Sequence, residues 1–292
     1  MKKCFLFLSL ITLLIVSSCS TDNSSDYLVT IKTNQGDMVA ILYDETPKHK
    51  ANFIKLAKEH YFDSLLFHRV IEGFMIQGGD PDSKNATPGQ QLGMGGPGYT
   101  VDAEFNPKFF HEKGALSAAR MPDQQNPAKA SSGSQFYIVQ GTVTSPADLD
   151  GLKIDAGKLN AAFQQILQNP SNQPLIDTLN QIYMTGDMQA YQRKIYSLVP
   201  RLEKQTGMNI YKEVSEEKIK AYTTVGGYPS LDGDYTVFGK VIDGLGVIDK
   251  IARLEKDSNN RPNQDLRMMV TIEEMPRKEI ESKYGYKYPT QK

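Results

Sequence analysis

The chain has 292 residues, of which 39% are hydrophobic and 23% are charged. This length allows one large domain or two, and the composition is that of an ordinary folded protein. Lys and Arg number 33 against 34 for Asp and Glu, so no overall charge excess indicates nucleic-acid binding or disorder.

The N-terminus has the pattern of a bacterial signal peptide. Two lysines precede an apolar run, residues 4–16, that is too short to cross a membrane as a helix. Two serines then come directly before Cys19, as in a lipobox, where cleavage leaves a lipid-modified cysteine. We therefore expect residues 1–19 to be a signal peptide and Cys19 to anchor the chain in the bacterial cell envelope, on the outer membrane facing the periplasm. A secretory signal with an incidental cysteine is the alternative.

The first folded elements are predicted to be a hairpin and a helix. Residues 20–26 are polar and predict a flexible tether, so folded structure should begin near Tyr27. Apolar and polar residues alternate from Tyr27, and a turn containing glycine then leads into the apolar run 38–43. This pattern predicts a β-hairpin. Thr46 and the proline after it predict a helix start, and apolar residues at helical spacing extend this helix to about His60.

Two later stretches combine polar and aromatic groups in an unusual way. The first, FHRVIEGFMIQGGDP at residues 67–81, contains Arg69, Phe74, Met75 and Gln77. In an alternating strand Arg69 would share a face with Phe67 and Ile71, which are apolar. The second, SGSQFYIV at residues 132–139, places Gln135 and Tyr137 on one side. Two such strands predict an apolar groove with a few fixed polar groups, as in a peptide-binding cleft.

The segments between and around these stretches exclude several other kinds of site. Residues 82–99 are rich in Gly and Pro and predict a loop. Their G-x-G-x-x-G spacing does not indicate a dinucleotide site, because a loop precedes it and no helix follows. The four histidines show no HExxH spacing, so we expect no metal site and no cofactor. His68 is expected to be a buried, hydrogen-bonded structural group, and residues 115–119 a short buried segment.

The spacing of apolar residues changes from two to nearly four in residues 144–225, which predicts a helical insertion. The expected helices cover residues 159–167, 175–183, 188–202, with a bend at Pro200, and 215–222. The insertion is large enough to bury a small core of its own or to dock on the rest of the protein. Strand character returns at 236–241 and 268–272, with a short helix at 247–254 between them, and residues 277–292 are expected to be a partly frayed C-terminal tail.

Four motifs in order resemble those of the cyclophilins, which are peptidyl-prolyl cis/trans isomerases. They are the two stretches above, GALSAA at residues 114–119 and LDGDYTVFGKV at residues 231–241. The resemblance covers about 27–141 and 226–275 and fails in the residues between. It implies a mainly β fold, an eight-stranded antiparallel barrel capped by two helices, encoded by residues 27–143 and 226–276 and interrupted by the helical insertion.

The resemblance also implies a role for each candidate site residue. Arg69 matches the catalytic arginine, which would stabilise the twisted amide without a covalent intermediate. The residues that match the walls of a proline pocket are Phe74, Met75, Tyr137 and Leu231. Gln77 and Gln135 match amides that orient the substrate, and Ala119 matches a groove position. The alternatives are ordinary core packing for the apolar residues and a structural ion pair for Arg69.

This chain departs from the family at several of these positions. Tyr137 stands where many cyclophilins have Phe, and its hydroxyl needs a partner or water. Ser230 and Tyr235 stand where Trp and His are common, and Arg120 replaces an Asn. These changes bear on the rate, on cyclosporin binding and on preferences beside proline.

The resemblance implies an isomerase that speeds the folding of exported proteins, with their proline-containing segments as partners and no nucleic acid. The alternative is a membrane-tethered proline-peptide-binding module or holdase in which the insertion grips clients. A third hypothesis is that the insertion mediates dimerisation, so that deleting about residues 149–220 would give an active monomer. The sequence leaves the oligomeric state open.

Overall fold

The computed structural model describes residues 24–145 and 148–289. The expected signal peptide, Cys19 and residues 20–23 of the expected tether lie outside the described residues. The strands are β1 Ser25–Thr33, β2 Gly36–Leu42, β3 Phe67–Ile71, β4 Met75–Gly78, β5 Thr100–Val101, β6 Ala115–Ala118, β7 Ser131–Ser132, β8 Phe136–Val139, β9 Val237–Asp243 and β10 Met269–Pro276. The helices are α1 Pro47–Lys58, α2 Leu149–Leu152, α3 Ala156–Leu167, α4 Gln173–Met184, α5 Met188–Ser197, α6 Val199–Thr206, α7 Glu216–Thr224, α8 Leu245–Ala252 and α9 Arg277–Tyr284.

Eight strands form one antiparallel sheet in the order β10-β1-β2-β9-β6-β8-β4-β3, as expected. Backbone hydrogen bonds just outside the strands join its two ends. The amide of Ser64 donates to the carbonyl of Met268 at 2.9 Å, and the amide of Phe67 donates to Leu266 at 2.9 Å. The amide of Val70, within β3, donates to Asn260 at 2.8 Å. The sheet therefore curls into a barrel whose seam lies between β3 and the residues before β10.

Helices α1 and α8 both contribute to the core of this barrel. Phe53 of α1 and Ile248 of α8 belong to one buried cluster with Phe136 of β8. Pro47 occupies the first turn of α1, as the sequence predicts, but Thr46 makes no capping hydrogen bond; its hydroxyl donates to the Tyr43 carbonyl instead. The apolar face of each helix thus covers an open end of the barrel. Helices α1 and α8 are therefore the two capping helices that were expected.

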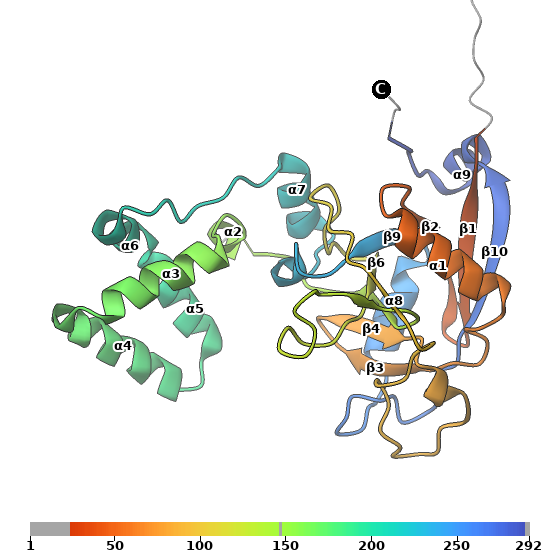
Figure 1. Ribbon diagram of the computed structural model, residues 1–292, viewed down its shortest axis with the longest axis horizontal. Helices are drawn as coiled ribbons and strands as arrows, with labels where there is room; N and C mark the ends of the chain where they lie inside the picture. Colours follow the sequence, from red (N-terminus) through yellow and green to blue (C-terminus); the bar gives the residue numbers. More distant parts are fainter. Residues whose placement is uncertain (1–23, 146–147, 290–292) are drawn as a thin grey trace, which may run out of the picture.

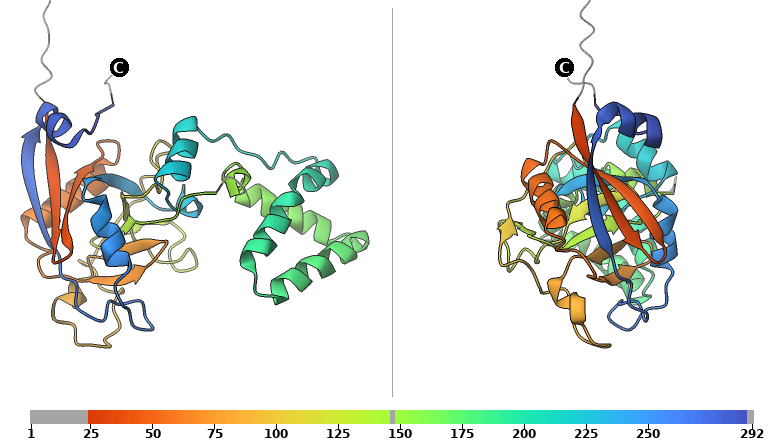
Figure 2. Two further views of the ribbon diagram at one scale, coloured as in Figure 1. Left: turned by 180° about the vertical axis from the view of Figure 1, so that it is seen from behind. Right: turned by 90° about the vertical axis from the view of Figure 1, so that its right-hand side faces the viewer.

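Helices α2 to α7 follow one another between β8 and β9, and Figure 1 and Figure 2 show α3 to α6 extending to one side of the barrel while α7 lies next to it. Helices α3 to α6 enclose their own core, which includes Ile166, Leu179 and Leu202. The expected helix over residues 188–202 is instead two helices, α5 and α6. Leu198 ends one and begins the other, and Pro200 in the first turn of α6 cannot donate the hydrogen bond that would continue α5.

Both ends of the described chain are more ordered than expected. Strand β1 begins at Ser25, within the expected tether, because Ser25 pairs with Pro276 at the end of β10. The tail, expected to be partly frayed, is helical over residues 277–284, and residues 285–289 have no regular secondary structure, while 290–292 lie outside the described residues. These residues form α9 and a segment of tyrosines that packs on the outer face of β1 and β2, against Leu28 and Ile41. These strands are thus covered on both faces.

Candidate active site

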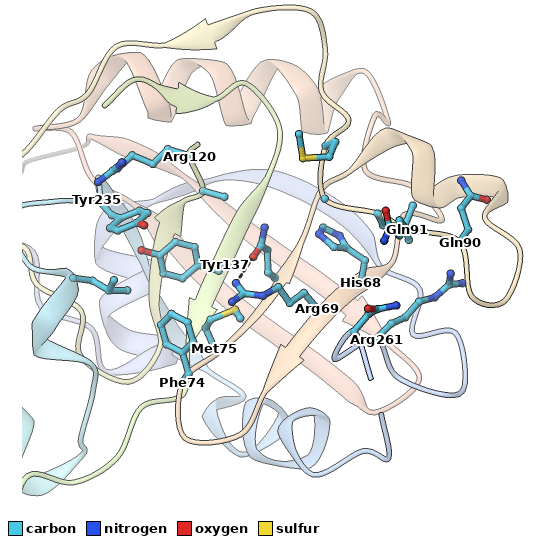
Figure 3. Close-up of a pocket in the computed structure, with 17 residues that line it drawn as sticks. His68, Arg69, Phe74, Met75, Gln90, Gln91, Arg120, Tyr137, Tyr235 and Arg261 are labelled. Carbon is cyan, nitrogen blue, oxygen red and sulfur yellow. Dashed lines mark hydrogen bonds between the residues drawn. The ribbon is translucent and has the colours of Figure 1, made fainter. Parts of the chain in front are cut away.

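A cavity of about 500 Å³ lies beside β3, β4 and β8. It brings together all but one of the eight predicted site residues, since Arg69, Phe74, Met75, Gln77, Ala119, Tyr137 and Leu231 line it. Gln135 lies behind this lining and contacts Gln77. Figure 3 shows Arg69 directed toward Phe74, Met75 and Tyr137. The cavity continues past Arg69 along His68 and a loop that includes Met94.

The strand register aligns the polar residues of the cavity. Arg69 of β3 lies opposite Gln77 of β4, which lies opposite Tyr137 of β8. The expectation that Phe67 shares the face of Arg69 is wrong. The register shifts between these two residues, so Phe67 packs in the barrel core while Arg69 lines the cavity. This irregularity turns Arg69 away from the barrel core, although Phe67, two residues before it, packs inside.

A chain of side-chain amides holds Arg69. Its Nη1 donates to Oε1 of Gln77 at 3.0 Å, and Nε2 of Gln77 donates to Oε1 of Gln135 at 3.1 Å. Nε2 of Gln135 then donates to the carbonyl of Gly95 at 2.7 Å. Burial lowers the pKa of Arg69, but a guanidinium stays charged across the ordinary pH range. Arg69 forms no ion pair with any residue in the described ranges, so the ion-pair alternative is wrong.

The apolar side of the cavity is a cluster separate from the barrel core. It contains Met75 and Tyr137, both buried, and the partly buried Phe74 and Leu231. Tyr228 packs against Phe74 with ring centres 4.3 Å apart. The guanidinium carbon of Arg69 lies 5.8 Å from the Phe74 ring centre. The cavity therefore offers an apolar slot with one cation at its side.

Behind Tyr137 lies a buried polar network that the sequence did not reveal. The hydroxyl of Tyr137 lies 3.0 Å from Nε2 of His111, whose Nδ1 lies 2.9 Å from Oδ1 of Asp232. Because a carboxylate only accepts, Nδ1 donates to Asp232. In the neutral imidazole Nε2 is then the acceptor for the Tyr137 hydroxyl. Two residues of α7 reach the other oxygen of Asp232. The Tyr222 hydroxyl donates to it at 2.8 Å and Nζ of Lys218 lies 2.5 Å away.

The ionisation of this network follows from its contacts. Burial alone would raise the pKa of Asp232, but the hydrogen bond from His111 and the ammonium of Lys218 hold it below its usual value. Burial raises the pKa of Tyr137 and of Tyr222, and the nearby Asp232 carboxylate adds to the rise at Tyr222. The phenols are therefore neutral donors and Asp232 is the charged acceptor. No local motif signals these contacts, because the residues lie far apart in the sequence.

The remaining lining residues include one buried histidine and two departures from the family. His68 is buried as expected, at 4% exposed. Neither ring nitrogen makes a hydrogen bond of ordinary geometry among the described residues, but a contact with the Leu66 backbone favours the charged ring, so the expected hydrogen bond stays a prediction. Burial lowers the pKa of His68 to about 4. Arg120 and Tyr235, which replace the family's Asn and His, lie together, with the guanidinium carbon 4.4 Å from the ring centre.

Two further properties of the described residues concern metals and membranes. Residues 24–145 and 148–289 contain no group of three or more His, Cys, Asp or Glu side chains arranged to hold a metal ion. In the same ranges, each helix is too short or too polar to cross a bilayer.

Comparison with protein families gives a match over most of the chain. The family described as cyclophilin type peptidyl-prolyl cis-trans isomerase/CLD matches residues 28–197 and 206–273. The match thus continues through most of the helical segment, where the four motifs had no counterpart.

Similar proteins carry related assignments. A protein of Staphylococcus aureus strain USA300 assigned as a peptidyl-prolyl cis-trans isomerase is 30% identical over 82% of this chain and 87% of its own length. One from Staphylococcus saprophyticus with the same assignment is 29% identical over 84% of this chain and 90% of its own. A Streptococcus pyogenes protein assigned as a bifunctional phosphatase/peptidyl-prolyl cis-trans isomerase is 31% identical, and this chain spans 39% of its length. A solved cyclophilin type isomerase from Cryptosporidium parvum is 21% identical, with a TM-score of 0.48 and coverage of 87% of this chain and 100% of that one.

Proposed function

Because this chain belongs to the cyclophilin-type peptidyl-prolyl cis-trans isomerases, we propose that it rotates X-Pro bonds in the cavity beside Arg69. The observation that carries this proposal is the Arg69 guanidinium, held by Gln77 and directed over an apolar slot without a carboxylate partner among the described residues. A proline ring is apolar and small, and Phe74, Met75 and Leu231 offer it an apolar contact surface.

The chemical task is to rotate a partial double bond. The barrier is about 18–20 kcal/mol because the nitrogen lone pair is shared with the carbonyl. In the twisted state the prolyl nitrogen becomes pyramidal and accepts a hydrogen bond. The bond from Arg69 to Gln77 uses Nη1, which leaves its other N–H groups to address that nitrogen and the substrate backbone. Rotation then needs no covalent intermediate, because the cation stabilises the twisted amide more than the planar one.

The catalytic proposal is tested with Arg69→Ala and Arg69→Lys in a coupled prolyl-peptide assay. We expect kcat/KM to fall about 100- to 1000-fold in Arg69→Ala, the usual cost of removing a transition-state donor. Arg69→Lys should lose most of this activity too, because an ammonium keeps the charge but lacks the planar fork. Arg193→Ala, an exposed arginine on α5, is the matched control. Wild-type activity in Arg69→Ala would refute the proposal, and an inert wild type would leave only peptide binding.

A second candidate function rests on the exposed apolar side chains of the insertion. Tyr183, Met184 and Met188 surround the turn between α4 and α5 and are 56%, 82% and 54% exposed. Such side chains favour contact with unfolded clients, as in the holdase hypothesis. The triple change to Ser would then abolish suppression of client aggregation without changing turnover of a short prolyl peptide.

For the cellular setting, we propose that Cys19 is lipidated and that the protein acts on proline-containing segments of exported proteins at the outer membrane, facing the periplasm. The support is the apolar run and the small residues before Cys19. Labelled palmitate should be incorporated by the wild type and not by Cys19→Ala, which should also leave the membrane fraction. Equal labelling of both would refute the anchor.

A further inference from the structure

The helical insertion and the cavity meet at one carboxylate. Asp232 follows Leu231, which lines the cavity, and its two oxygens face different partners. Oδ1 accepts from the ring and the backbone amide of His111, both at 2.9 Å. Oδ2 accepts from Tyr222 at 2.8 Å and lies 2.5 Å from Nζ of Lys218, both on α7. Asp232 is thus the link between an inserted helix and the wall of the cavity.

Burial makes each contact in this link consequential. His111 is fully buried, the Asp232 side chain is 10% exposed and Tyr222 is fully buried between Phe110 and Leu152. Hydrogen bonds in such surroundings are stronger than in water, and losing one partner leaves the other polar group unpaired at a cost. A change at α7 is therefore felt at His111 and not absorbed by solvent.

The far end of the link is a hydroxyl in an apolar wall. Tyr137 is 4% exposed, and its ring contacts the same cluster as Met75 and Phe74. Figure 3 shows the Tyr137 hydroxyl pointing away from Arg69, and this hydroxyl pairs with Nε2 of His111, so the ring can present an apolar surface to the cavity. Without that acceptor the hydroxyl would be left with Ser117, which lies opposite Tyr137 on β6, or would have to turn toward the cavity or admit water.

We propose that His111 and Asp232 are positioning residues that hold Tyr137 in the cavity wall, and that α7 of the insertion sets this wall through Asp232. The inference rests on the proposed function and deepens it. The inserted helix becomes part of the substrate-binding apparatus although it does not line the cavity.

The test is a double-mutant cycle in the full chain. Asp232→Asn removes the charge that orients His111, and Tyr222→Phe removes one insertion contact while keeping the ring. In the wild-type background we expect each change to raise KM for a prolyl peptide about three- to tenfold, with a smaller change in kcat, because the wall contacts the planar and twisted substrate alike. In a Tyr137→Phe background the same changes should alter KM less than about twofold, since no hydroxyl remains to be paired.

Tyr211→Phe, which removes a hydroxyl from an exposed residue of the same insertion, should leave KM unchanged in both backgrounds. The melting temperature of every variant is measured, so that a loss of folded protein can be told from a change at the site. If Asp232→Asn fails to fold, Tyr222→Phe still allows the cycle to be completed. An equal rise in KM in both backgrounds, or no rise in either, would overturn the inference. The proposed function would still stand in that case, provided that the wild type is active. An inactive wild type would refute the proposed function instead.

Discussion

The buried imidazole of His68 predicts a specific pH dependence of stability. Its pKa falls from 6.5 to about 4 in the folded chain, mainly because burial penalises the charged form. Between these pH values the unfolded state binds a proton that the folded state does not, so stability is full above pH 6.5 and falls as the pH is lowered. The difference of about 2.5 units corresponds to roughly 3 kcal/mol lost between pH 6.5 and 4.

The perturbation that isolates this effect is His68→Asn, which removes the titrating ring. Urea unfolding at several pH values can be followed by near-UV circular dichroism of tyrosines, since the chain contains no Trp. The variant is expected to lose about 3 kcal/mol less than the wild type between pH 6.5 and 4. The matched control is His60→Asn, because His60 is exposed and its positive φ of 55° is tolerated by Asn. Parallel losses in the wild type and His68→Asn would refute the reasoning.

Two further predictions concern the insertion and the groove. Leu202→Ala should destabilise the insertion by about 2–5 kcal/mol, because Leu202 is fully buried in the core of the insertion. Urea unfolding followed by the circular dichroism of the helices measures this loss, and an unchanged unfolding midpoint would contradict an independent core in the insertion. Ala119→Leu should raise KM for prolyl peptides about tenfold or more by filling the cavity where a small side chain stands, with an unchanged melting temperature. Unaltered peptide binding in that variant would mean that substrate does not pass Ala119.

Much of the barrel and its cavity could be predicted because local patterns specify them. Arg69, Gln77 and Tyr137 belong to two short motifs, and they lie at opposed positions of neighbouring strands. The apolar run 38–43 carries a further signal, since a strand apolar on both sides must be covered on both faces. That signal predicts a covering element such as α9, whereas the charged C-terminal sequence suggested fraying.

Other features could not be predicted because they depend on contacts distant in the sequence. The shift between Phe67 and Arg69 reverses a side chain without any Gly or Pro to mark it. The partners of Tyr137 come from His111 and, through it, from Asp232, which packing alone brings together. Likewise the depth at which His68 is buried depends on residues distant in the sequence, such as Arg261, which no local pattern encodes.

The closed seam of the barrel affects how this protein can meet unfolded chains. Extended polypeptides readily add to an open strand edge, and the substrates of a prolyl isomerase are such polypeptides. Here the outer amides of Phe67 and Val70 are already bonded to Leu266 and Asn260. A substrate therefore cannot extend the sheet along β3, next to the cavity, and in the cavity it is held by side chains. At this seam a passing strand finds no template on which to begin a fibre.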